Sequence, residues 1–235
     1  MPHAGRPEVI DVPAEHIQHL NGVATLNPRY AATVAGMTDA TFKLVELAPL
    51  IAYQFHVATD RTDELCAPLS HPPRVAELLP VCLPQDLEIA PSQLATLPSS
   101  LCFKTSSLNL RIMGAGQLGI DAAQHFIAGI AFGPSSNLVQ VIRFEGRCYL
   151  RNGFHRAFGL ARAGATHIPC IFMEAANFEQ VGVLGAMQTF GRELLESDDP
   201  PTVGHLTADR AYPVSLRTIT RVITVSWSEY AFLES

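Results

Sequence analysis

The residues best suited to chemistry lie in one short run, Asn152-Gly153-Phe154-His155-Arg156. Strand-forming residues precede this run and helix-forming residues follow it, so it marks the start of a helix. The first backbone amides of a helix have no partner inside the helix, and the helix dipole is positive at that end. His155 and Arg156 add donors and charge, while Gly153 lets a ligand approach the backbone closely. The run therefore predicts a site for phosphate or a similar anion.

The elements that must position this run are predicted within residues 138–173. An apolar strand at 138–144 leads through a hairpin turn at 145–147 into a second strand that ends at Asn152. Alanine and leucine favour a helix after Gly153, and Gly164 ends it. Pro169 opens a last strand, so the predicted order is strand, tight turn, strand, helix and strand.

The other predicted elements come from hydrophobic periodicity and from the positions of Pro and Gly. In chain order they are a helix at 15–20, a strand at 42–47, a helix at 74–82, a strand at 108–113, helices at 120–130 and 178–195, and strands within 214–227. Residues 84–107 are rich in Pro and Ser and are predicted as a loop-rich insertion. Because strands and helices mix without a regular strand–helix alternation, the expected fold class is α+β.

Composition narrows the classes of function. The chain has 235 residues, of which 48% are hydrophobic and 16% charged, and its formal net charge is -6. This charge disfavours nucleic acid as a partner, because binding to nucleic acid needs clustered basic groups. Five scattered cysteines are typical of reduced, buried thiols. No signal peptide or membrane-spanning segment is evident, so a cytoplasmic protein without a membrane partner is expected.

The pattern of Asn152-Gly153, the basic pair His155-Arg156, a small-residue helix and a strand opened by Pro169 resembles the ParB/sulfiredoxin superfamily. Its members include partition proteins that bind CTP, sulfiredoxins that use ATP and free-serine kinases that use ADP, and their turn holds nucleotide phosphates. The resemblance implies a ParB/sulfiredoxin-like mixed sheet with flanking helices. It also implies a domain at 37–180 with a Gly/Pro/Ser-rich insertion at about 84–130. An extension at 1–36 would precede this domain, and a strand extension at 181–235 would pack on it.

The resemblance also assigns roles to residues. The segment KLVELAPLIAYQFHV is similar to the family's first strand, which places Gln54 and His56 opposite the turn. The implied catalytic residues are His56 and His155. The implied cofactor-binding residues are Gln54, Asn152, Gly153, Phe154, His155 and Arg156. The implied cofactor is a nucleotide (ATP, ADP or CTP) with Mg²⁺, and the implied partner is a small phosphorylated molecule.

Departures from the family pattern leave the activity open. Sulfiredoxins carry a nucleophilic Cys where this chain has Phe154, and the kinase-like members carry Asp where this chain has Asn152, which cannot act as a general base. Glu46 and Asp60 are candidate bases near the first strand. The chain is therefore expected to be a phosphotransferase or nucleotide hydrolase, or else a non-catalytic binding protein of the same fold. A homo-oligomer also remains open.

A second glycine-rich motif supports a different class of function. The sequence Gly114-Ala-Gly-Gln-Leu-Gly119 matches the GxGxxG fingerprint, which places a dinucleotide pyrophosphate on a helix N-terminus. In that interpretation the protein is an NAD(P)- or FAD-binding oxidoreductase, with Glu145 as the acidic residue of the fingerprint. The alternative is a flexible glycine-rich loop within the insertion.

Overall fold

The computed structural model describes residues 4–54, 56–86, 92–97, 100–105, 110–134, 136–183, 189–208, 211–214, 221–226 and 228. The chain divides into two compact units. The first unit consists of Met1–Leu87 and Ser136–Pro213, and the second of Glu88–Ser135 and Val214–Ser235.

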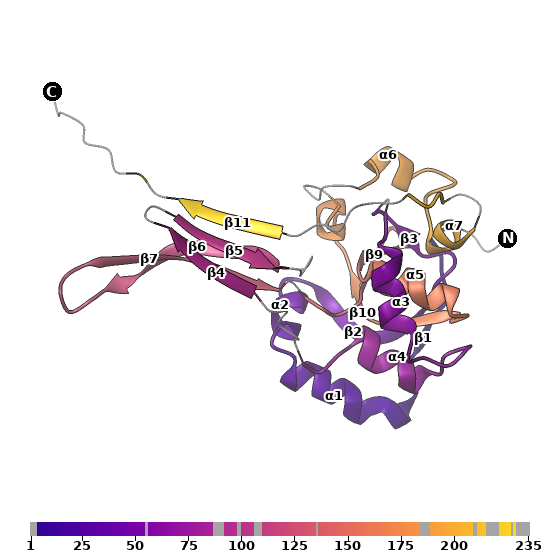
Figure 1. The fold of residues 1–235 in the computed structure, drawn as a ribbon. Helices are drawn as coiled ribbons and strands as arrows, with labels where there is room; N and C mark the ends of the chain where they lie inside the picture. Colours follow the sequence, from indigo (N-terminus) through magenta and orange to yellow (C-terminus); the bar gives the residue numbers. More distant parts are fainter. Residues whose placement is uncertain are drawn as a thin grey trace. The chain divides into compact units, whose positions relative to one another are not determined.

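A six-stranded mixed sheet lies at the centre of the first unit (Figure 1), in the order β1-β2-β10-β8-β9-β3. Its strands are β1 (Val9–Asp11), β2 (Thr38–Glu46), β3 (Ile51–Ala52), β8 (Gln140–Phe144), β9 (Arg147–Asn152) and β10 (His167–Glu174). The pairs β10–β8 and β9–β3 are parallel, and the other neighbours are antiparallel. The predicted α+β class with a mixed sheet is confirmed.

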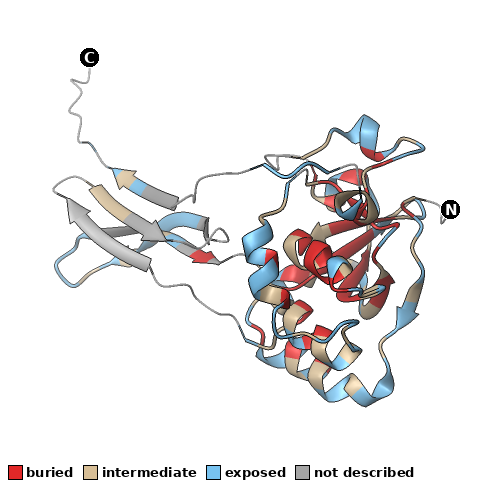
Figure 2. Ribbon diagram, turned by 45° about the vertical axis from the view of Figure 1, so that its right-hand side comes forward, coloured by how far each residue is buried: buried red, intermediate tan, exposed pale blue. Residues whose placement is uncertain are grey.

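Helices flank this sheet. They are η1 (Ala14–His16), α1 (Ile17–Leu26), α2 (Tyr30–Val34), α3 (Thr59–Cys66), α4 (Val75–Cys82), α5 (Phe154–Arg162), η2 (Phe178–Val181), α6 (Arg192–Leu195) and α7 (Val203–Thr207). Residues 168–173 of β10 are all buried, which requires cover on both faces of the sheet (Figure 2). Among the described residues, no helix has the length and apolar character needed to cross a membrane.

The predicted order of elements over residues 138–173 is confirmed. The hairpin between β8 and β9 turns at Glu145 and Gly146, which have φ angles of 49° and 74°, as a two-residue turn of this kind requires. Gly153 precedes α5 with φ 103°. After α5, Gly164 adopts φ 86°, and the amide of Ala165 donates to the carbonyl of Leu160 at 2.9 Å. This hydrogen bond closes the helix end in a Schellman motif.

The second unit consists of β-strands in its described part. One sheet has the order β11-β5-β4, and a hairpin joins β6 to β7. The strands are β4 (Ser92–Leu97), β5 (Ser100–Thr105), β6 (Leu110–Ile120), β7 (Phe126–Pro134) and β11 (Arg221–Ser226). The stretch predicted as loops thus contains β4 and β5. The strand predicted at 108–113 begins β6.

The predicted helix at 120–130 is wrong. The Asp121 carboxylate accepts hydrogen bonds from the amides of Ala123 and His125, both at 2.9 Å. A side chain that binds nearby amides in this way favours a turn over a helix, and β7 follows the turn.

The division into units also differs from the predicted domains. Strand β11 pairs with β5, so the end of the chain belongs with the insertion and not with the first unit. Residues 1–36 and 181–213 are part of the first unit. Of the helix predicted at 178–195, the structure shows η2 and α6, while 184–188 lie outside the described residues.

The structure predicts unequal costs for two glycine substitutions. A Cβ at Gly153 would lie 2.8 Å from Val139 Cγ2, whereas one at Gly146 would meet nothing within 4 Å. Gly146→Ala should therefore lose about 1–2 kcal/mol for its left-handed backbone, and Gly153→Ala about 2–4 kcal/mol, because overpacking is added. Urea unfolding of both variants measures the difference, and equal losses would contradict this account of the turn.

Candidate functional site

The turn at Gly153 lies at an edge of the sheet where two parallel strands end together. Strand β3 pairs with β9 through Ile51↔Tyr149 and Ala52↔Leu150, so the residues that follow β3 emerge beside the start of α5. Ligands of open sheets that contain parallel strands commonly bind at the carboxyl ends of those strands.

Tyr53 joins these two segments. Its hydroxyl donates to the carbonyl of Arg151 at 2.9 Å, and its ring packs edge-on against Phe154 at 5.1 Å between centroids. Burial raises the pKa of Tyr53 to about 12, so the phenol keeps its proton and remains a donor. The Phe154 side chain is itself buried, so its ring has a packing role, and its backbone amide is the group that could make the predicted cofactor contact.

The N-terminus of α5 has an unusual charge pattern. The first amide bonded inside the helix is that of Ala157, which donates to the Gly153 carbonyl at 2.8 Å. Helix geometry leaves the amides of Phe154, His155 and Arg156 without a partner inside the helix. The first turn contains no acidic residue. It carries the Arg156 cation and the His155 imidazole, whose lowered pKa favours the neutral form, and positive charge there opposes the helix dipole. This pattern is unfavourable for an empty helix and favourable for one that holds an anion.

Further cationic groups surround His155. Burial is the largest cause that lowers the pKa of His155, and the charges of His56, Arg156 and Arg61 lower it further, while Asp60 opposes them. His56 and Arg61 are exposed, and an Arg61 guanidinium nitrogen lies 3.4 Å from Glu64. His155 is half-buried, so the cluster can reach a ligand at the helix start. Arg61 was not predicted; its only signal was its place in the polar stretch after His56.

The Arg156 side chain bonds to backbone carbonyls of α4 and of residue 137. Its Nη1 donates to the carbonyls of Val81 and Cys82, each at 3.3 Å, and to that of Asn137. The first two carbonyls belong to the last turn of α4, where helix geometry leaves them without partners. No ion pair joins Arg156 to a carboxylate in the described part of the chain. These contacts give Arg156 a structural role, which differs from the predicted phosphate contact.

Asn152 has a similar role. Its side-chain nitrogen Nδ2 donates to the backbone carbonyls of Ser136 at 2.7 Å and Leu138 at 3.0 Å. Asn27 donates to the Pro84 carbonyl at 2.7 Å and to Asn137 Oδ1 at 3.1 Å. Asn137 in turn donates to the Asp86 carbonyl at 2.8 Å. We call Asn27, Asn137, Asn152 and Arg156 the polar clamp, because together they hold residues 81–86 against residues 136–138.

The Gln54 side chain bonds within its own segment. Its Nε2 donates to the carbonyl of His56 at 2.6 Å, and its backbone forms an isolated bridge with Thr189. Of the predicted site residues, Gly153, His56 and His155 thus meet at the start of α5. Gln54, Asn152, Phe154 and Arg156 instead support the surrounding chain.

The two predicted bases lie apart. Asp60 lies in the first turn of α3 and accepts from the Arg61 amide at 2.9 Å. Glu46 accepts from the amide of Glu8 at 3.1 Å and lines a cavity beyond the other end of α5. Asp60 is therefore the predicted base whose charge acts on the start of α5.

The glycine motif does not have dinucleotide-binding geometry. Residues 114–119 lie inside β6, which continues into the β6–β7 hairpin. The fingerprint needs a helix N-terminus directly after its glycines, and a strand stands there instead. The β8–β9 hairpin turn contains Glu145, at φ 49°. The alternative of a flexible loop is likewise replaced by a strand.

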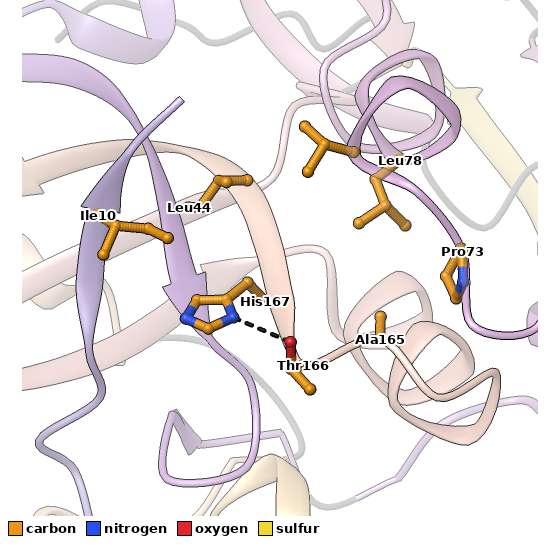
Figure 3. Close-up of a pocket in the computed structure, with 8 residues that line it drawn as sticks. Ile10, Leu44, Pro73, Leu78, Ala165, Thr166 and His167 are labelled. Atoms are coloured by element: carbon orange, nitrogen blue, oxygen red, sulfur yellow. Dashed lines mark hydrogen bonds between the residues drawn. The ribbon is translucent and has the colours of Figure 1, made fainter. Parts of the chain in front are cut away.

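Two cavities lie just beyond the other end of α5. One has a volume of about 180 Å³ and the other about 420 Å³, and both are lined by Ala165, Thr166 and His167. Figure 3 shows the smaller one, where Thr166 Oγ1 and His167 Nδ1 lie 3.0 Å apart. His167 Nε2 lies 3.6 Å from Glu8, beyond hydrogen-bonding distance. This end offers a largely apolar surface with the His167 imidazole and the Glu46 carboxylate, without the cationic cluster of the other end.

Metal and thiol sites need particular placements and protonation states of His, Cys, Asp and Glu side chains. The described residues contain no group of three or more such side chains placed to hold a metal ion. All five cysteines are free, and four are buried. Burial raises the pKa values of Cys82 and Cys148 to about 12, which keeps these thiols protonated. No family model, curated protein or solved structure matches this chain.

The contacts of Arg156 predict a stability effect. Arg156→Ala would remove the side-chain donor of three carbonyls, of which that of Cys82 keeps the Val139 amide, and should lower the free energy of unfolding by about 2–4 kcal/mol. Arg156→Lys should recover only part of this loss, because an ammonium cannot reproduce the planar guanidinium. Urea unfolding measures both variants against Arg61→Ala, which removes an exposed ion pair with Glu64 and should cost at most about 1 kcal/mol. Equal losses for Arg156→Ala and Arg61→Ala would refute the structural role.

Proposed function

We propose that the first unit binds a small phosphorylated ligand, of the nucleotide class, at the N-terminus of α5. The observation that carries this proposal is the composition of the first turn of α5. Its backbone amides have no partner inside the helix, its side chains include basic residues, and it contains no acidic residue. A negative ligand group would relieve the repulsion between this turn and its neighbours His56 and Arg61. We further propose that the domain is of the ParB/sulfiredoxin-like class, as the Asn-Gly-x-His-Arg pattern suggests.

In this proposal the backbone holds the phosphate. The amides of residues 154–156 would donate to its oxygens, and His155 would supply a side-chain donor from the same turn. His56 and Arg61 would neutralise charge from the neighbouring segment. Arg156 contributes charge at longer range, because its guanidinium already donates to carbonyls. A nucleotide (ATP, ADP or CTP) fits this donor set through its phosphates, and Mg²⁺ would arrive with the nucleotide.

Two outcomes of binding follow from the residues present. Phosphoryl transfer or nucleotide hydrolysis relies mainly on positioning and charge neutralisation. Asp60 would be the carboxylate of the site, since its charge acts on His155, and His155 would be a neutral imidazole that can accept a proton. The alternative is a non-catalytic binding protein. The Asn152 side chain donates to two backbone carbonyls. This favours the non-catalytic alternative, because the position that holds Asp in the kinase-like members then holds no base.

Variants at the helix start test the binding site. Using pyrophosphate and ATP, each with and without Mg²⁺, in isothermal titration, we expect His155→Asn to weaken binding about 10-fold or more, the scale of one charge-assisted hydrogen bond. Arg61→Ala should weaken it by a smaller factor, since Arg61 is exposed. His125→Asn is the matched control, because His125 pairs with Asp121 in the second unit. Unchanged affinity in both site variants would refute the proposal, and turnover assays on the same samples separate the enzyme from the binding protein.

The pH dependence of sulfate binding provides a second readout. The pKa of His155 is lowered from its ordinary value of 6.5 in the free protein, and a bound dianion would raise it. Binding then takes up a proton, so affinity should increase as the pH falls through the bound-state pKa and level off below the free-state pKa. Sulfate keeps both charges over this range, so the change reports on the protein. A profile that is the same for wild type and His155→Asn would exclude contact with His155.

A further inference from the structure

We infer that β7 in the second unit is a self-association edge, which pairs antiparallel with β7 of a second copy of this chain. The hairpin of β6 and β7 forms a two-stranded sheet of its own. In the described part of the chain β7 pairs with β6 alone, and the outer edge of a strand presents backbone donors and acceptors to a further strand.

The two strands of the hairpin differ in how their outer edges are protected. The register of β6 shifts twice, between Ile112 and Gly114 and between Gln117 and Gly119, whereas β7 runs without a shift. Bulges, prolines and charges are the usual means by which an edge strand avoids pairing. Residues 126–133 of β7 contain neither Pro nor a charged residue. In the first unit, by contrast, the edge strands β1 and β3 are only 3 and 2 residues long.

The sequence of β7 is complementary to itself. Residues 126–132 read Phe-Ile-Ala-Gly-Ile-Ala-Phe, so a twofold axis at Gly129 would set Phe126 opposite Phe132 of the partner subunit. The same register sets each Ile opposite an Ala, and Gly129 opposite its own equivalent. Aromatic pairs stabilise antiparallel strands, and a large residue opposite a small one avoids crowding. A twofold antiparallel contact also closes on itself, which limits the assembly to a dimer.

The composition of the hairpin fits a second copy better than a charged partner. Leu118 and Ile120 of β6 are 74% and 51% exposed, and Arg111 is the only charged residue of the two strands. The surface therefore offers main-chain hydrogen bonds and apolar contact without charge complementarity. An uncharged, self-complementary strand of another chain meets these conditions, and β7 of a second copy is such a strand.

Cysteine cross-linking tests this register in the full-length chain. Antiparallel partners have Cα atoms about 4.5–5.5 Å apart, a separation that a disulfide can span, so Gly129→Cys should form a covalent dimer on mild oxidation. The added Cβ meets only the end of the Leu118 side chain, at 2.7 Å, which can rotate. Ala131→Cys is the control, because its two copies would lie about 13 Å apart along the strands. Both variants use a Cys102→Ser background, since the other four cysteines are buried.

Sedimentation velocity supplies an independent measurement. Ile130→Lys places charge on the β7 edge and should weaken dimerisation about 10-fold or more, whereas Ala122→Lys, which adds the same charge at an exposed position of the turn between β6 and β7, should leave it nearly unaltered. Circular dichroism verifies the fold of each variant. The inference is overturned if the wild type is monomeric at all concentrations, if Ile130→Lys and Ala122→Lys behave alike, or if the Gly129→Cys variant cross-links no better than the Ala131→Cys variant.

Discussion

The fold of the first unit depends on the contacts that hold residues 136–138, where the chain re-enters this unit from the second. Residues 136–138 must lie against the end of α4, because the central strand β8 begins two residues later, at Gln140. The polar clamp accomplishes this with side-chain donors to backbone carbonyls, and the amide of Val139 adds a hydrogen bond to the Cys82 carbonyl at 2.9 Å. Buried carbonyls in irregular backbone are costly unless each finds a donor. Four side chains from distant parts of the sequence meet this requirement.

The same constraint shapes the start of α5. Val139 lies so close to Gly153 that a Cβ there would approach it to 2.8 Å, and the left-handed turn at Gly153 sends the chain directly from β9 into the helix. Arg156 must turn back toward α4 to reach its carbonyls. It therefore brings its positive charge beside the helix N-terminus without serving as a first contact for a ligand. The clamp and the proposed anion site thus share one helical turn, which explains why this turn lacks the acidic residues that a helix start ordinarily favours.

The sequence was informative where local physics determines the backbone. The turn at 145–146, the glycine before α5 and the glycine after it each require a particular φ sign, and all three elements appear as predicted. The role of Arg156 could not be predicted, since its partners Val81, Cys82 and Asn137 are set by tertiary packing. The GxGxxG motif misled because glycine permits strand bulges as well as helix-opening turns. The prediction of a helix at 120–130 failed because β7 contains no charged residue. In such a run the hydrophobic periodicity cannot distinguish a strand from a helix.

The central claim is that the amides at the start of α5 bind a phosphate group, and NMR titration tests it most directly. Backbone amide resonances of the ¹⁵N-labelled full-length chain would be followed during addition of pyrophosphate at constant pH and ionic strength. The account predicts that the largest shifts occur at Phe154, His155 and Arg156, with smaller shifts around His56 and Arg61, and that His155→Asn reduces them all. Shifts absent from these amides, or concentrated at Thr166 and His167 beside the cavities, would contradict it.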